Sequence, residues 1–257
     1  MRKAVAIGLL LLALPVCAWE YASQTAETVH SVQIRVGAEF QKKWNNGIRL
    51  GIEEDLRSDV YNSDDGPAFR TSHTTLTFAY HPIEYVKLDA GYTLKITNKK
   101  NAIPSKLLRH RVFMSVSGIY HTPYVKLSVR ERFLMEARTD SVNPLEKNQF
   151  NWQMRTRIAS EFYVPGKPVK PYIWCELTNT LNAPEYQRLN GRQFISQVRT
   201  QAGVKWRLTR MSSLDFYYRF TYGYSRDINI TKKKGLIELE EETLFQHAFG
   251  VAYDLNW

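Results

Sequence analysis

Polar and apolar side chains alternate along most of this chain, and the segment from Gln149 to Val164 shows the pattern most clearly. One set of alternate positions is apolar: Phe150, Trp152, Met154, Ile158, Phe162 and Val164. The intervening set is polar or charged: Gln149, Asn151, Gln153, Arg155, Arg157 and Glu161. A period of two residues is that of a β-strand. A long strand with one apolar and one charged face is typical of a transmembrane β-barrel with a polar interior.

The same alternation recurs along the chain and predicts eleven strands. Their expected ranges are Ser31–Lys43, Ile48–Arg57, Arg70–Tyr80, Glu84–Thr97, Leu107–Tyr120, Tyr124–Arg138, Gln149–Val164, Val169–Leu181, Phe194–Leu208, Ser213–Ser225 and Glu242–Trp257. Because bacterial single-chain barrels have an even number of strands, we expect a short additional strand between Trp19 and Ala26. The predicted fold is all-β, a transmembrane antiparallel up-and-down β-barrel of about 12 strands, with about 10 as the alternative.

The predicted connections alternate between short turns and longer polar loops. Short turns are expected near Asn45, Pro82, Thr122, Gly166 and Arg210. Longer loops are expected at Ser58–Phe69, Asn98–Lys106, Thr139–Asn148, Asn182–Gln193 and Asp227–Glu241. Outer-membrane barrels have short periplasmic turns and long extracellular loops, so the C-terminus is expected on the periplasmic side.

The final segment of the chain ends in an aromatic residue, Trp257, and is apolar or aromatic at every second position before it. These positions are Phe245, His247, Phe249, Val251, Tyr253 and Leu255. The pattern resembles the terminal strand by which the bacterial barrel-assembly machinery recognises its clients. That machinery is therefore an expected partner.

Residues 1–18 have the features of a secretory signal peptide, with Arg2 and Lys3 before an apolar run and a small-residue cleavage site that ends at Ala18. The apolar run is too short to span a bilayer as a helix. Acylation of Cys17 is a weaker alternative, because Pro15 and Val16 fit poorly before a lipidated cysteine. The expected mature domain is residues 19–257, in the outer membrane.

Composition constrains partners and stabilisation. The chain has 35 Lys and Arg against 25 Asp and Glu, a formal charge of +10, and removal of Arg2 and Lys3 leaves a basic mature domain. These positive charges are spread over alternating strand positions of an exported chain, which disfavours nucleic acid and favours outer-membrane lipids, including lipopolysaccharide phosphates. Cleavage after Ala18 would leave Cys175 without a cysteine partner, so no intrachain disulfide is expected.

Several short charged patterns carry a resemblance to a known family. They are Glu53 with Arg57, Gly91-Tyr92, Arg109-His110-Arg111, Arg130-Glu131-Arg132, Arg155-Thr156-Arg157 and Glu176. Together they resemble the strand motifs of a Bacteroidetes-type family of bacterial outer-membrane barrels catalogued as a domain of unknown function (number 2490). The resemblance covers most of the mature chain and implies a fold and a location, but no reaction.

The candidate site is a set of charged residues that share the inward phase of their strands. Its members are Glu53, Asp55, Arg57, Arg109, Arg111, Arg130, Arg132, Arg155, Arg157, Glu161 and Glu176. One interpretation is a structural ladder that fills a narrow lumen. The other is an anion-preferring constriction or solute site, in keeping with passive transport or solute binding. If Tyr163–Val169 is a tight turn, Arg157 and Glu176 should lie opposite each other.

Two rival functions remain open. A lipid-modifying enzyme of the lipase or deacylase kind would use His110 or His247 as a base, with Ser160 or Ser212 as nucleophile, although no fixed-spacing motif links them. A secreted, soluble β-sandwich binding protein is the other rival. The histidines are scattered, so we expect no metal or other cofactor.

Two lysine groups in the predicted loops are candidates for binding lipid phosphates: Lys99, Lys100, Lys106, Lys232, Lys233 and Lys234. A monomer is expected.

Overall fold

The structure is a computed structural model of the 257-residue chain. It describes residues 23–62, 68–98, 106–139, 149–183, 195–231 and 236–257. The predicted signal peptide at residues 1–18 lies outside these ranges, as do five of the loop lysines: Lys99, Lys100, Lys232, Lys233 and Lys234. Lys106 begins a strand.

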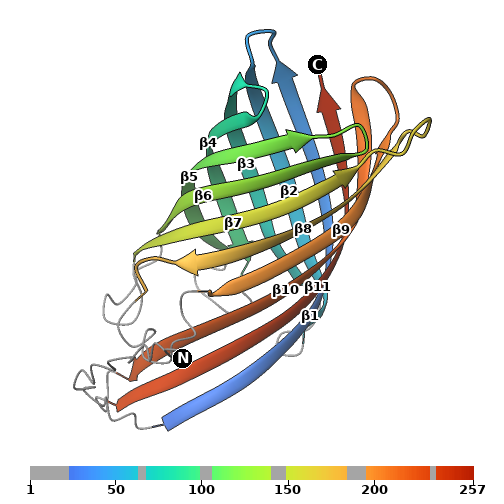
Figure 1. The fold of residues 1–257 in the computed structure, drawn as a ribbon. Coiled ribbons are helices and arrows are strands. Elements are labelled where there is room, and N and C mark those ends of the chain that lie inside the picture. The colour runs from blue at the N-terminus through green and yellow to red at the C-terminus, as the bar shows by residue number, and fades with distance from the viewer. Residues whose placement is uncertain (1–22, 63–67, 99–105, 140–148, 184–194, 232–235) are drawn as a thin grey trace, which may run out of the picture.

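Eleven strands within the described residues form one closed barrel, as Figure 1 shows. They are β1 (Ser23–Lys43), β2 (Ile48–Asn62), β3 (Ala68–Ile83), β4 (Val86–Asn98), β5 (Lys106–His121), β6 (Val125–Arg138), β7 (Phe150–Phe162), β8 (Val169–Thr180), β9 (Gln197–Arg207), β10 (Ser212–Thr231) and β11 (Leu236–Asn256). Consecutive strands pair antiparallel, which is the up-and-down topology that the alternation predicts.

The barrel closes through a parallel pair, β1 with β11, whose register runs from Ser23 opposite Glu238 to Gln41 opposite Asn256. The additional strand expected between Trp19 and Ala26 is not a separate element in the described part of the chain. Residues 23–26 are the first part of β1 instead. The even-number rule misleads here because an odd number of alternating strands still closes a barrel when its first and last strands run the same way.

The exterior of the barrel is apolar because alternate residues of each strand point to opposite faces. On β1, Ile34 and Val36 are each 50% exposed, whereas Arg35 between them is buried at 5%. All six apolar residues of the segment analysed first, Phe150 to Val164, are exposed. The strand phase inferred from the sequence is therefore correct.

Two carboxylates break the outward apolar pattern. Glu54, on β2, shares the outward phase of Ile52 and Leu56 and accepts hydrogen bonds from Ser72 Oγ and from Thr74 Oγ1, the latter at 2.6 Å. Glu131, on β6, lies between the exposed Val129 and Phe133 and is itself exposed. The residues on either side of these two, Glu53 and Asp55 on β2 and Arg130 and Arg132 on β6, point into the barrel interior instead.

Short connections gather at the end of the barrel where the chain terminates. They are residues 44–47, 84–85, 122–124, 163–168 and 208–211. Gly47, with φ of 81°, and Gly166, with φ of 70°, adopt the left-handed conformation that tight turns require. The Trp257 amide donates to the Gln41 carbonyl at 3.0 Å, which fixes the chain end beside the β1–β2 turn.

Two of the predicted long loops are shorter than expected. Strand β2 continues to Asn62 and β3 starts at Ala68, so much of Ser58–Phe69 is strand. Strands β10 and β11 likewise reach Thr231 and Leu236. These polar segments extend because they pair along their whole length, from Ser225 opposite Glu242 to Thr231 opposite Leu236.

No helix in the described ranges is long and apolar enough to cross a bilayer. Cys175 is an exposed free thiol on β8, so the described residues carry no disulfide. The barrel is held by its closed hydrogen-bonded sheet and by the side chains that fill its interior.

Candidate functional site

Two adjoining cavities occupy the barrel interior. One has a volume of about 340 Å³ and the other of about 430 Å³. Nine charged residues line both cavities and so mark where they meet: Arg35, Glu39, Glu53, Asp55, Lys87, Asp89, Arg130, Arg157 and Arg219. The interior is therefore hollow, and every residue that lines both cavities is charged.

The 340 Å³ cavity, here called the arginine-rich cavity, has a large excess of positive charge. Its lining includes eleven basic residues: Arg35, Arg49, Arg57, Lys87, Arg111, Arg130, Arg132, Arg155, Arg157, Arg199 and Arg219. Five carboxylates accompany them: Glu39, Glu53, Asp55, Asp89 and Glu176. In a confined space with little room for screening ions, such an excess attracts anions.

The 430 Å³ cavity, here called the mixed cavity, carries no such excess. Its lining has seven basic residues: Arg35, Lys87, Lys126, Arg130, Arg157, Lys205 and Arg219. Seven carboxylates balance them: Glu39, Glu53, Asp55, Asp89, Glu161, Asp215 and Asp254. Lys126, Glu161 and Asp254 lie near the short-turn ends of their strands, so this cavity extends toward that end of the barrel.

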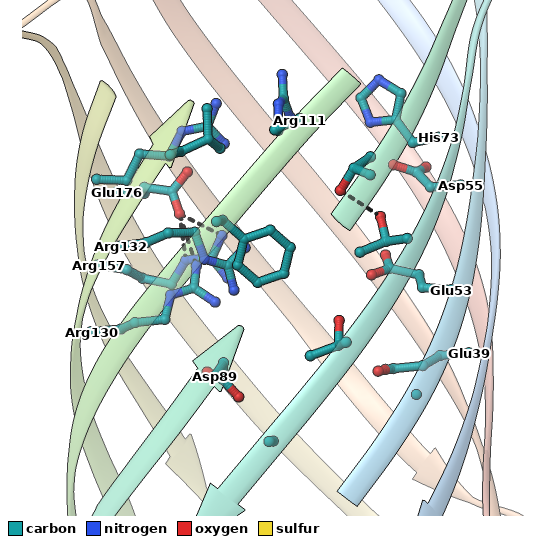
Figure 2. A pocket seen from close by; sticks show the side chains of 18 of the residues that line it. Glu39, Glu53, Asp55, His73, Asp89, Arg111, Arg130, Arg132, Arg157 and Glu176 are labelled. Atoms are coloured by element: carbon teal, nitrogen blue, oxygen red, sulfur yellow. Dashed lines mark hydrogen bonds and ion pairs between the residues drawn. The ribbon is translucent and has the colours of Figure 1, made fainter. Parts of the chain in front are cut away.

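Glu176 is the centre of the arginine cluster, as Figure 2 shows. It is only 1% exposed and accepts hydrogen bonds from Arg157 Nε at 2.8 Å, Arg130 at 3.1 Å and Arg199 at 3.2 Å. The register sets Glu176 directly opposite Arg157 on β7 and Arg199 on β9. The predicted Arg157–Glu176 pair across the β7–β8 hairpin is thus present.

Two further carboxylates each hold a pair of arginines. Glu136 accepts from Arg111 at 2.5 Å and from Arg109 at 3.2 Å. Asp55 pairs with Arg35 and with Arg57, the latter at 2.7 Å. Each of these carboxylates pairs with two or more guanidinium groups, so the ion pairs carry a net positive charge.

Besides Arg49, three arginines of the arginine-rich cavity have no carboxylate partner among the described residues. Arg155 donates only to the Gln153 amide oxygen at 2.9 Å, and Arg219 donates to the Gln201 amide oxygen at 2.7 Å. Arg132 has no hydrogen-bond acceptor in this part of the chain and instead stacks over the Phe113 ring at 4.0 Å. These three groups account for much of the uncompensated charge.

Inward aromatic rings position these guanidinium groups. Arg157 lies over the Trp174 ring at 3.9 Å, in the same way that Arg132 lies over Phe113. Gly91 makes room for Phe113, because a Cβ at residue 91 would come within 2.4 Å of the ring and 2.5 Å of the Leu76 carbonyl oxygen. The glycine in the Gly91-Tyr92 motif therefore shapes the site by leaving space for an aromatic support.

The side of the arginine-rich cavity formed by β1 and β2 carries three carboxylates beside three arginines: Glu39, Glu53 and Asp55 with Arg35, Arg49 and Arg57. Glu39 on β1 and Glu53 on β2 are direct cross-strand neighbours and both point into the interior, as Figure 2 shows. Glu53 makes no hydrogen bond or ion pair within the described ranges, and Glu39 accepts only from the Gln41 amide. Glu53 acts electrostatically on Arg132 of the facing cluster.

Like charges thus stand opposite each other on both walls. On β6 and β7, Arg130 faces Arg157 and Arg132 faces Arg155, while Glu39 faces Glu53 on β1 and β2. Like charges directly opposite each other in a sheet are destabilising, and an alternating arrangement would be more stable. These like-charge pairs therefore cost stability.

A compact hydrogen-bond network belongs to the mixed cavity. The Tyr172 hydroxyl donates to Asp215 Oδ2 at 2.8 Å and accepts from Gln201 Nε2 at 2.6 Å. Tyr172, Gln201 and Asp215 are each at most 8% exposed. Gly203 provides space for the tyrosine, since a Cβ there would come within 2.7 Å of its hydroxyl.

Most of the predicted site residues meet in one place. Nine of them line the arginine-rich cavity: Glu53, Asp55, Arg57, Arg111, Arg130, Arg132, Arg155, Arg157 and Glu176. Glu161 lines only the mixed cavity, where it pairs with Lys126 at 3.3 Å, and Arg109 lines neither cavity. The expected set missed Arg35, Asp89, Arg199 and Arg219, although the inward phase of their strands was available to find them.

The structure separates the residues proposed for an enzyme. Strand β6 lies between the strands that carry His110 and Ser160: His110 is opposite Ala137, and Ser160 is opposite Leu127. These two β6 positions are ten residues apart, roughly 33 Å at the usual strand rise. His247 and Ser212 are separated by eight positions along β10, roughly 26 Å. The histidine rings instead meet tyrosine hydroxyls, Tyr92 with His110 at 2.5 Å and Tyr218 with His247 at 2.7 Å. Neither matched pair can act as a nucleophile and its base.

No group of three or more potential metal ligands occurs in the described residues. The chemistry that the interior offers is binding of charged groups by guanidinium and carboxylate side chains.

The fold and the interior together define a closed β-barrel with an apolar exterior and a charged, hollow lumen. The chain belongs to the family described as "Protein of unknown function (DUF2490)", whose model matches residues 31–231. Among solved structures, it is similar to one titled "NanC porin structure in rhombohedral crystal form". That similarity has a TM-score of 0.46 and 10% sequence identity, over 73% of this chain and 86% of the other. No curated protein matches the chain.

Proposed function

We propose that this protein is an outer-membrane barrel that provides a passive pathway for small solutes and favours anions. The observation that carries this proposal is the segregated charge of the arginine-rich cavity, in which Arg132 faces Arg155 with no carboxylate partner for either. A lumen built only for stability would place unlike charges opposite each other. Exposed guanidinium groups in a narrow water-filled space attract anions and exclude cations.

The outer-membrane location rests on the apolar exterior and on the terminal strand that ends at Trp257. An exterior rich in exposed apolar residues is costly in water but is suited to lipid. Cell fractionation combined with heat-modifiable gel mobility tests this location. Recovery of the folded protein from the periplasm without detergent would contradict it.

Deletion of Trp257 is expected to lower the folded membrane fraction while export continues, and unchanged assembly would contradict its role in insertion.

Ion selectivity in planar lipid bilayers tests the proposed pathway. Purified wild-type barrel is expected to conduct ions. In a KCl gradient, the sign of its zero-current potential should show that chloride permeates better than potassium. The double variant Arg132→Gln with Arg155→Gln should reduce the anion-over-cation permeability ratio, because it removes positive charge that no carboxylate compensates. A cation preference in the wild type, unaffected by the two substitutions, would contradict the proposal.

A purely structural charged plug is the second candidate, and Glu176 with its three arginines favours it. The same double variant separates the two functions. A plug predicts no conductance in either the wild type or the variant. A pathway predicts conductance, and little change in stability because neither arginine has a carboxylate to leave unpaired.

A further inference from the structure

Glu39 and Glu53, on the β1–β2 side of the arginine-rich cavity, make no ion pair with any arginine of the described residues. Glu53 is exposed to the interior and has no hydrogen-bond or ion-pair partner among the described residues, although arginines surround the same cavity. Its cross-strand neighbour is another carboxylate, Glu39. Two carboxylates that face each other across a strand pair repel, and a cationic group between or above them would relieve that repulsion.

The basic wall lies on the other side of the same cavity. Arg132 and Arg155 face each other there without carboxylate partners, and the Nε atom of each is buried and makes no hydrogen bond. Arg132 is held rigidly by its stack on Phe113 at 4.0 Å. Figure 2 shows Glu53 and Glu39 on one side of the cavity and Arg130, Arg132 and Arg157 on the other. The cavity therefore presents the Glu39–Glu53 carboxylate pair on one side and the guanidinium groups of Arg132 and Arg155 on the other, whereas Arg35 and Arg57 on the carboxylate side are paired with Asp55.

A solute that carries only negative charge is attracted by one wall and repelled by the other. A solute with an ammonium group at one end and a carboxylate at the other can satisfy both walls at once when it lies across the cavity. Guanidinium groups bind carboxylates through charge-assisted hydrogen bonds, and carboxylates bind ammonium groups in the same way. The volume of about 340 Å³ lies within the range of small-molecule sites.

We propose that the arginine-rich cavity is a binding site for small zwitterions, in which Glu53 and Glu39 receive the ammonium group and Arg132 and Arg155 receive the carboxylate. This inference rests on the proposed pathway, because the solute must reach the cavity from outside. It adds that the pathway prefers dipolar solutes such as amino acids over neutral solutes of equal size.

Liposome swelling with the purified barrel tests the inference, because zwitterionic and neutral solutes need no counter-ion. The probes are L-glutamine, which is zwitterionic, and arabinose, a neutral sugar of similar mass. Wild-type barrel is expected to admit glutamine about two- to fivefold faster than arabinose, the effect of one exposed charge pair. Glu53→Gln should abolish that preference, measured as the ratio of the glutamine rate to the arabinose rate in the same preparation.

Glu54→Gln is the matched control, since Glu54 is the adjacent residue with the same side chain but the outward phase. It should keep the wild-type preference. Arg132→Gln should lower both the glutamine preference and the anion selectivity, whereas Glu53→Gln should lower the first and raise the second. This opposite response distinguishes a two-walled site from a general effect of lumen charge.

The outcomes separate this inference from the function on which it rests. A barrel that conducts and prefers anions, but admits glutamine and arabinose equally and is unaffected by Glu53→Gln, would overturn the zwitterion site and leave the pathway intact. A barrel that neither conducts nor swells liposomes would overturn both. Equal losses of preference in Glu53→Gln and Glu54→Gln would also overturn the site, because the outward residue does not reach it.

Discussion

The two interior cavities contain similar side chains but arrange their charges differently. In the mixed cavity the seven basic and seven acidic residues balance, and short hydrogen bonds link Gln201 to Tyr172 and Tyr172 to Asp215. In the arginine-rich cavity eleven basic residues stand against five acidic ones. Under the proposed function, the excess of positive charge places the solute chemistry in the arginine-rich cavity, and the balanced mixed cavity contributes mainly to stability.

The largest expected effect comes from removing the central carboxylate of the arginine cluster. Glu176→Gln leaves Arg130, Arg157 and Arg199 without their shared acid, and loss of one side of a buried ion network costs about 3–5 kcal/mol. Unfolding by urea in detergent, followed by gel mobility, measures this change. The control is Glu161→Gln in the mixed cavity, which breaks one partly exposed pair with Lys126 and should cost less than about 1 kcal/mol. Equal losses would show that the two cavities do not differ in this way.

A second prediction concerns the aromatic support of Arg132. Gly91→Ala places a Cβ within 2.4 Å of Phe113 and 2.5 Å of the Leu76 carbonyl oxygen. Such overpacking should cost about 1–3 kcal/mol, and because it displaces the ring under Arg132, it should also reduce anion selectivity. Thermal unfolding and zero-current potentials measure the two effects.

Gly118→Ala is the control for this change, since it lies on the same strand pair and a Cβ there meets no atom within 4 Å. It should leave both stability and selectivity at wild-type values. A selectivity change of equal size in Gly118→Ala would contradict the proposed role of the Phe113 stack.

The smallest effect is expected in the mixed cavity. Tyr172→Phe removes the hydroxyl that joins Asp215 to Gln201, at a cost of about 1–2 kcal/mol for the unsatisfied buried partners. Ion selectivity should not change, because the substitution removes no charge. Thermal unfolding with bilayer recordings on the same preparation checks both statements, and a shift in selectivity as large as that of Arg132→Gln would assign the solute chemistry to the mixed cavity as well.

The strand phase was the most predictable part of this molecule. A period of two fixes which side chains point inward, and so Arg130, Arg132, Arg155, Arg157 and Glu176 could be placed in the lumen from the sequence alone. The Arg157–Glu176 pair followed from the tight turn between their strands. Barrel closure was less predictable, because the long pairing of β1 with β11 depends on contacts between the two ends of the chain.

The segregation of charge across the lumen could not be predicted from the sequence. It depends on which strands face each other across the closed barrel, so Glu53 could be assigned to the interior but not to a wall opposite Arg132. The inward position of the supporting aromatic residues could not be predicted either. Phe113 is inward although it is apolar, and only the space at Gly91 on the neighbouring strand explains how it fits.

Anomalous scattering from crystals of the barrel soaked in bromide would test the contrast between the two cavities most directly. The account predicts a bromide ion in the arginine-rich cavity, beside Arg132 and Arg155, and none in the mixed cavity, whose seven basic and seven acidic side chains balance in number. Bromide in the mixed cavity alone, or at equal strength in both cavities, would contradict it.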